Sequence, residues 1–269
     1  MVELNSKYKI GKRRFGLVNW IGFISLYKKE TLRFLIVSGQ TILGPVLTGI
    51  LFLIVLSIAW GEDRGEVLGL PFIEFLAPGL ISMQVIQQSF SHSSSSLLGG
   101  KMMGSIIDLI GSPLSAGEVT IAIILASVTR AFIICVTSIF CFNFFVEISI
   151  LNYYQFFIFL IFSSFLMGAL GFIAGIWADR YDNMATITNF IIIPLSFLSG
   201  TFYSIERLPN ILKEMSYYNP FFHMIDGLRY SMIGISDGST MFGLIYLLSF
   251  NLVLWLVAYY LYKIGYKIK

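Results

Sequence analysis

Side chains that enzymes use for catalysis are sparse in this sequence, and none of them forms a catalytic pattern. Gly100 and Lys101 resemble one corner of a phosphate-binding loop, but the upstream glycine and the following Ser or Thr are missing. His92 and His223 lie far apart and belong to no HExxH pair, so a metal-dependent membrane protease is not indicated. We therefore expect this chain to hold no catalytic residue, no metal and no cofactor.

Arg130 lies about a dozen residues into a long apolar run, where a cation is costly in lipid and should face other helices or a wet cavity. A roughly antiparallel neighbouring helix could bring Glu74 within reach, so we predict an intramembrane charge pair of Arg130 and Glu74. The alternatives are a contact with backbone carbonyl groups and a direct role in a translocation path. Glu74 and Glu147 lie near the ends of their apolar runs, so ion-coupled transport lacks its usual mid-membrane carboxylate.

Four amides in otherwise apolar segments are candidates for a transport pathway: Gln84, Gln87, Gln88 and Asn189. Such side chains can line a polar route between helices. They can equally hold neighbouring helices together by hydrogen bonds.

The elements that position these residues must be membrane helices. The sequence is 57% hydrophobic and 12% charged, with a mean hydropathy of +0.81, whereas soluble domains are about half apolar and about a quarter charged. No Pro-, Gly- or Ser-rich linker divides the chain, so we expect one transmembrane domain over residues 1–269. The small net charge of +3 does not indicate a nucleic-acid partner.

A helix needs roughly 20 mostly apolar residues to cross a bilayer. Six segments have this character, which predicts an all-α protein with the spans 38–60, 71–90, 119–146, 153–177, 184–204 and 240–262. The second is the least regular, because its half from Gln84 onward is rich in Gln and Ser. Pro194 removes a backbone donor from the fifth and should kink it.

Residues 1–36 form a basic arm whose second part carries apolar residues at helical spacing. This pattern predicts an amphipathic helix at the membrane surface, with a solvated cytoplasmic helix as the alternative. With the N-terminus inside, thirteen Lys and Arg residues lie on the inner side and four on the outer side. This asymmetry predicts that both termini, including the tail 263–269, are cytoplasmic.

Two connections carry more than turns. In 97–118, the apolar residues from Ile106 to Ile110 predict a short helix, which Gly111 would end in a left-handed conformation and which Pro113 could not continue. In 205–238, Pro209 and Pro220 each stand where a helix could begin. Two short apolar-faced helices there predict a re-entrant or interfacial hairpin on the outer side.

Within that hairpin, His223, Asp226 and Arg229 recur at offsets of three, which places them near one helix face. They can brace the hairpin, or they can contact a substrate or a gate.

Several stretches carry a family resemblance. Phe75–Leu80 and Ile107–Leu114 are similar to the second span and the following cytoplasmic helix of the ABC-2 family of membrane permeases, which includes drug, polysaccharide and lipid-linked glycan exporters. The stronger match is to that family's C-terminal signature, and it comprises Pro194–Gly200, Leu208, Pro209, Asn219, Pro220, Phe221, His223, Asp226 and Arg229. Ile110, Gly111 and Ser112 depart from the family pattern, in which two leucines and a basic or small residue are expected.

The resemblance implies the six-helix fold of an ABC-2, type V exporter and a half-transporter that works as a homodimer in the bacterial inner membrane. A separate ABC-type ATPase subunit, which binds ATP and Mg, would drive outward movement of an amphipathic drug, lipid or glycan-type substrate. The short helix would be the ATPase-coupling element, with the contact residues Lys101, Ile107, Asp108, Leu109, Ser112, Pro113 and Leu114. The hairpin with Pro209, Pro220, His223, Asp226 and Arg229 would cap or gate the exit.

Two alternatives remain open at this point. The 97–118 connection can be an ordinary linking helix, and the chain can be a membrane assembly or channel-like protein that uses no ATP.

Overall fold

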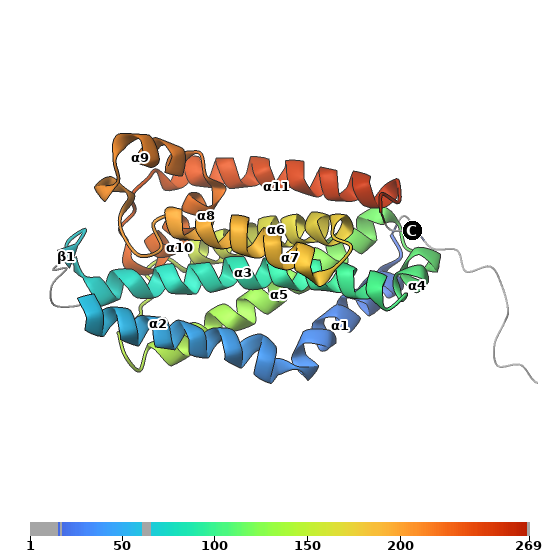
Figure 1. Cartoon of the computed structure of the whole chain (residues 1–269), viewed down its shortest axis with the longest axis horizontal. Helices are drawn as coiled ribbons and strands as arrows, with labels where there is room; N and C mark the ends of the chain where they lie inside the picture. The colour runs from blue at the N-terminus through green and yellow to red at the C-terminus, as the bar shows by residue number, and fades with distance from the viewer. Residues whose placement is uncertain (1–15, 17, 61–65, 268–269) are drawn as a thin grey trace, which may run out of the picture.

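Long apolar helices lie side by side along the molecule and give it an elongated shape (Figure 1). The computed structural model describes residues 16, 18–60 and 66–267, so the basic residues Lys7 to Arg14 and the acidic Glu62 and Asp63 lie outside the described residues. α4, the start of α1 and the end of α11 mark one end of the bundle, here named the α4 end. α9 and the strand pair mark the other, the α9 end.

Four helical segments are long and apolar enough to cross a membrane. They are Gly39–Ala59, which combines the π-helical turn η1 (Gly39–Leu43) with α2 (Gly44–Trp60), and then α5 (Ala116–Phe142), α6 (Tyr153–Trp177) and α11 (Thr240–Lys263). Six spans were expected, and four segments of this kind are present among the described residues. The other two expected spans are helical but more polar.

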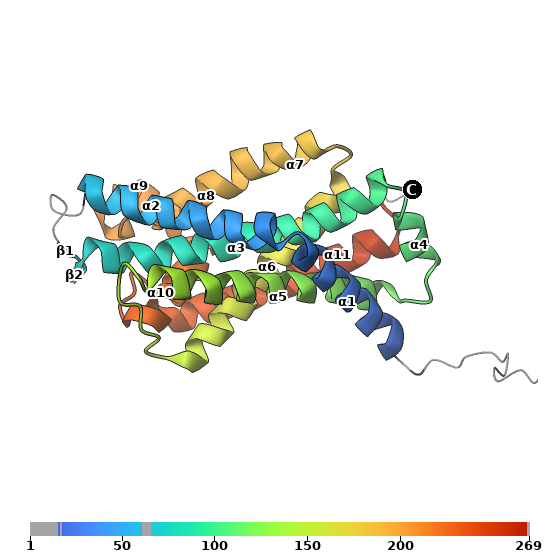
Figure 2. The same cartoon turned by 90° about the horizontal axis from the view of Figure 1, so that it is seen from below.

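The expected second span is α3 (Phe72–Met102), which lies in the middle of the bundle against α2, α5, α6 and α10 (Figure 2). The prediction that a loop begins near residue 97 was wrong, because this helix continues to Met102. Small residues allow the continuation: a Cβ atom at Gly171 of α6 would lie only 2.3 Å from the carbonyl oxygen of Phe90. Close backbone contact of this kind is a common way to pack membrane helices.

The expected fifth span is a rod of α7 (Tyr181–Ile187), the π-helical turn η2 (Thr188–Ile192) and α8 (Ile193–Leu198). It ends earlier than predicted, because Gly200 has a positive φ of 78° and Thr201 turns its hydroxyl back to the carbonyl of Ser196. At Pro194, where a kink was expected, the rod contains the π-helical turn η2, which ends two residues before the proline. Pro45 follows η1 in the same way, so both prolines stand two residues after a π-helical turn.

Short elements occupy the two ends. At the α4 end are α1 (Trp20–Ile36), which confirms the helix expected within 1–36, and α4 (Ile106–Gly111). Towards the α9 end are the strands β1 (Glu66–Val67) and β2 (Leu70–Pro71), which pair antiparallel, and the helices η3 (Ile205–Arg207), α9 (Asn210–Tyr217) and α10 (Pro220–Ile233).

The helix starts expected in 205–238 are confirmed. Asn219 caps α10 by accepting a hydrogen bond from the backbone N–H of Phe221, and Pro220 is the first residue of that helix. Pro209 lies immediately before α9.

Candidate functional site

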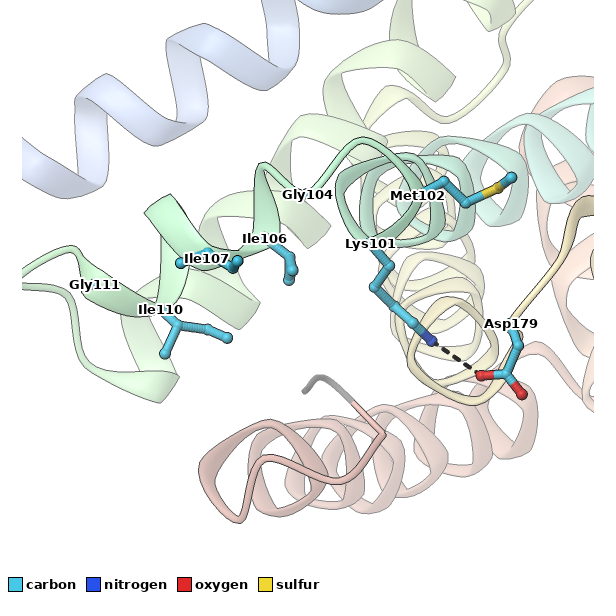
Figure 3. Close-up of a pocket in the computed structure, with 8 residues that line it drawn as sticks. All are labelled: Lys101, Met102, Gly104, Ile106, Ile107, Ile110, Gly111 and Asp179. Carbon is cyan, nitrogen blue, oxygen red and sulfur yellow. Dashed lines mark ion pairs between the residues drawn. The ribbon is translucent and has the colours of Figure 1, made fainter.

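α4 projects from the end of the bundle and presents apolar side chains outward. Ile107 and Ile110 are 71% and 51% exposed, and Met102 and Met103, which end α3, are exposed beside them. Met102, Ile107 and Ile110 border a cavity of about 630 Å³ that Lys101 and Asp179 line on its other side (Figure 3). Exposed apolar surface rimmed by charge is typical of a protein-binding site.

The termination of α4 differs from the prediction. Gly111 remains helical, and the left-handed glycine is Gly104, in the turn that connects α3 to α4. α4 ends because Ser112 is extended, as a residue before proline prefers, and its hydroxyl donates to the carbonyl of Leu109.

A network of hydrogen bonds holds the segment after α4 in place. Ser115 and Glu118 form a reciprocal capping box at the start of α5. Glu118 also accepts the backbone N–H of Asn19 at 2.6 Å, and the Asn19 amide donates to the carbonyl of Pro113. Because Asn19 also caps α1 through the N–H of Gly22, the starts of α1 and α5 and the end of α4 form one unit.

The predicted ATPase-coupling residues divide into two groups. Ile107, Asp108 and Pro113 are exposed, as a contact surface requires. Leu109 and Leu114 are half-buried and pack on the apolar cluster around Leu26 and Val119, and Ser112 is half-buried.

Lys101 bonds the end of a neighbouring helix within the bundle. Its ammonium group donates to the carbonyl oxygens of Ile176 and Ala178 at the end of α6, at 2.8 and 2.6 Å. Asp179, which also bonds Lys267, lies 3.7 Å from it. The hydrogen bond from Lys267 holds the pKa of Asp179 below its ordinary value.

A charged cluster of buried Glu30 and half-buried Arg33 joins α1 to α3, and it was not predicted from the sequence. Glu30 pairs with Arg33 at 3.0 Å and accepts the hydroxyl of Ser96 at 2.7 Å. Arg33 donates to the carbonyl of His92 and to the hydroxyl of Ser95. This cluster fixes the inner face of α1 against the polar half of α3.

Arg130 does not pair with Glu74, so that prediction was wrong. Its guanidinium donates to the side-chain oxygen of Gln88 and to the carbonyl oxygen of Thr41. Neutral oxygens from α3 and η1 therefore receive this cation, and no carboxylate pairs with it within the described part of the chain. The carbonyl-contact alternative agrees with this geometry.

Three of the four candidate pathway amides, Gln84, Gln87 and Gln88, line one groove beside α3, and Asn189 lies apart from them. Gln84 holds helices together, because it donates to the carbonyl of Pro45 and accepts the hydroxyl of Ser138. Gln87 and Gln88 line open grooves on either side of α3. Asn189 is exposed and borders neither groove.

At the α9 end, the three residues predicted on one face of α10 are all buried and make different contacts. His223 bonds the carbonyl of Tyr217 at 2.9 Å, and Asp226 accepts the backbone N–H groups of Asp237 and Gly238. Arg229 donates to the carbonyl of Gly200, and its guanidinium carbon lies 3.9 Å from the centre of the Phe75 ring. These contacts brace the loops around α10.

Asp237 was not predicted as part of this group. It lies 3.9 Å from Arg229 and accepts hydrogen bonds from the hydroxyl of Ser204 and the N–H of Ile205. An Asp-Gly turn was visible in the sequence, but nothing in it indicated these distant donors. By contrast, the Ser-x-x-Glu spacing of Ser115 and Glu118 is a recognisable capping box and could have been predicted.

Comparison with known proteins identifies the family of this chain. The ABC-2 type transporter family profile matches residues 22–233, which run from α1 to the end of α10. The chain belongs to the ABC-2 type transporter family. It is thus an α-helical membrane permease of the ABC transporter class, and the family resemblance drawn from the sequence is confirmed.

Two groups of relatives agree with this assignment. The inner membrane transport permease YadH of Escherichia coli strain K12 is 29% identical over 240 residues, which cover 88% of this chain and 94% of the relative. Nodulation protein J of Neorhizobium galegae is 23% identical over 227 residues, covering 81% and 83% of the two chains. Nodulation protein J of Rhizobium leguminosarum bv. viciae is 22% identical over 227 residues.

The family implies an ABC-type ATPase as partner. Family membership thus suggests a partner for the exposed tip of α4, which the geometry alone does not identify.

Proposed function

We propose that this chain is the transmembrane half of an ATP-driven exporter that works as a homodimer in a bacterial inner membrane and carries an amphipathic drug, lipid or glycan-type substrate outward. A separate ABC-type ATPase binds ATP and Mg and docks on the α4 end. The observation that carries this proposal is the apolar, exposed tip of α4, which is held rigidly to α1 and α5.

Rigidity matters because a coupling element must transmit movement. If α4 hung on a loose loop, closure of the ATPase would displace the loop alone. The bonds of Asn19 to Glu118 and Pro113 instead tie α4 to the starts of two long helices. Movement of α4 would therefore turn α1 and α5 together.

The membrane arrangement follows from the helices and the charges. α3 and the α7–α8 rod join the four apolar segments as spans, because both run lengthwise beside them (Figures 1 and 2). The α4 end faces the cytoplasm, since Lys101, Arg180, Lys263 and Lys267 gather there. α1 lies along the inner surface, and α9 with α10 forms the outer hairpin.

The test is copurification of this chain with an ABC-type ATPase coexpressed from the same organism. We expect the wild-type chain to retain the ATPase and a double variant, Ile107→Asp with Ile110→Asp, to lose it, because buried charge opposes an apolar contact. Ile211→Asp on α9 is the matched control, since Ile211 is 75% exposed at the opposite end.

Retention of the ATPase by the double variant would contradict docking on α4. A chain that neither retains an ATPase nor stimulates ATP hydrolysis would favour the ATP-independent assembly or channel-like function.

A further inference from the structure

A groove of about 270 Å³ with a mixed lining lies between α3 and the α7–η2 segment, and it is here named the polar groove for the hydrogen-bonding side chains that it contains beside apolar ones such as Phe90 and Met184. Its hydrogen-bonding side chains are amides and hydroxyls, among them Gln87, Ser91, Ser94, Tyr181 and Thr188. None of the described residues that line it is charged. The groove therefore offers hydrogen bonds to an oxygen-rich molecule.

An apolar groove of about 430 Å³ lies on the opposite side of η2, between α6, α8 and α11. Its lining includes Leu170, Ile173, Ala174, Trp177, Ile191 and Leu254. Such a lining suits hydrocarbon and little else.

The two grooves adjoin. Phe90 and Ile192 line both of them, and each of these side chains is only 2% exposed. η2, whose π-helical turn ends at Ile192, is thus a thin wall with polar space on one side and apolar space on the other.

Positive charge stands directly behind the polar groove. Arg33 donates to Ser95, and Arg130 donates to Gln88, and both acceptors line the groove. Glu30 balances Arg33, whereas Arg130 has no carboxylate partner among the described residues. The local field therefore favours anionic or neutral oxygen-rich groups and disfavours cations.

We propose that the two grooves form one cargo site for an amphipath, with an oxygen-rich, non-cationic headgroup between α3 and α7 and a hydrocarbon chain between α6, α8 and α11. The proposal rests on the exporter function above and narrows its substrate class to phospholipid-like or glycolipid-like molecules. Cationic amphipathic drugs are excluded from this site.

The experiment measures lipid retention by the purified permease in native mass spectrometry. The probes are phosphatidylglycerol, a diglucosyl diacylglycerol and a dialkyl dimethylammonium salt with chains of matched length. We expect retention of the first two and not of the third. Retention of the cationic probe at the same level would overturn the proposal.

Matched variants locate the site. Ala174→Phe fills the apolar groove and Ala185→Phe fills the polar one, and each should lower retention roughly tenfold, because several methylene or hydroxyl contacts are lost. Ala59→Phe makes the same change on an exposed part of α2 outside both grooves and should have no effect.

Because Ala174 is buried, Ile191→Asn, at a half-exposed position of the same groove, provides a second test. Wild-type retention by both Ala174→Phe and Ile191→Asn would refute the site.

Addition of ATP to the complex with the ATPase distinguishes cargo from a resident lipid. Cargo should be released, and retention unaffected by ATP would overturn the cargo assignment. The lipid-retention measurement needs no ATPase. A chain that binds these lipids but recruits no ATPase would therefore contradict the proposed exporter function and would still support the lipid-binding site.

Discussion

Single residues at the centre of the bundle show how this chain accommodates polar groups in an apolar interior. Gln88 is the clearest example, because its oxygen accepts from the Arg130 guanidinium. Leaving a buried polar group without a partner costs more free energy than a hydrogen bond contributes. When one partner is removed, most of the lost stability therefore comes from the unsatisfied group that remains.

We therefore expect Gln88→Leu to lower the free energy of unfolding by about 1–3 kcal/mol, since Arg130 would keep only the Thr41 carbonyl. Thermal unfolding in detergent measures the effect. Gln87→Leu is the matched control, because Gln87 makes no hydrogen bond within the described part of the chain. Equal loss in both variants would show that general polarity, and not this contact, matters.

Charge reversal at both Arg130 and Glu74 should not restore a protein damaged by Arg130→Glu.

Asp179 predicts a pH dependence at the α4 end. Lys267, and then Lys101, hold the pKa of this carboxylate below its ordinary value, so the folded state favours the ionised form. The stabilisation is complete above the unfolded pKa of about 4 and disappears as the pH falls through the lower, folded pKa. Asp179→Asn should therefore lower the melting temperature by the same amount at pH 5 and at pH 7, and it should flatten the acid side of the melting-temperature profile. Superimposable profiles for the variant and the wild type would contradict this pairing.

Helices and their ends form the next scale, and here the sequence was most informative. Apolar runs of sufficient length predicted α2, α5, α6 and α11, and proline with a capping residue predicted α10. The runs could not predict where α3 ends, because the glycines that accommodate its polar half lie on α6, which is distant in sequence. Nor could they predict the partner of Arg130, since facing residues depend on how helices rotate against one another.

The attachment of α1 should depend on Asn19. Asn19→Ala removes the helix cap and the bond to Pro113, and we expect a loss of about 1 kcal/mol in the free energy of unfolding. Faster protease cleavage near residue 19 would accompany it. Ser25→Ala on the same helix is the control, because the Ser25 hydroxyl bonds only the preceding turn at Ile21. Unchanged cleavage in Asn19→Ala would show that the apolar face of α1 suffices.

Pro194 should maintain the π-helical turn in the α7–α8 rod. Pro194→Ala supplies the missing backbone N–H and removes the ring that clashes with the preceding turn. We expect slower amide hydrogen exchange over Thr188–Ile192 and a lower rate of substrate-stimulated ATP hydrolysis in the complex. Unaltered exchange would mean that packing, and not proline, sets the turn.

The whole molecule leaves one side of α3 incompletely covered. α2 and the α7–α8 rod flank that side (Figure 2), and both expose large apolar residues such as Leu47 and Phe190. A second copy seated across this side would enclose Gln87 and Gln88 between two chains. This arrangement fits the proposed homodimer.

Cysteine crosslinking in membranes tests the dimer in a chain lacking Cys135 and Cys141. Leu47→Cys or Phe190→Cys should give a crosslinked species of twice the 30.3 kDa chain mass. Leu252→Cys, on the exposed face of α11, should not. Crosslinking only through α11 would place the partner on the other side.

The polar half of α3 also bears on how the protein is made. α3 leaves the ribosome before α5, α6 and α10, the helices that later surround its serines and glutamines. On its own, such a polar segment inserts unfavourably into the hydrocarbon core of the bilayer. The insertion machinery must therefore shelter α3 until its neighbours arrive, and a nascent chain that stalls before α6 should be recognised and degraded as an orphan.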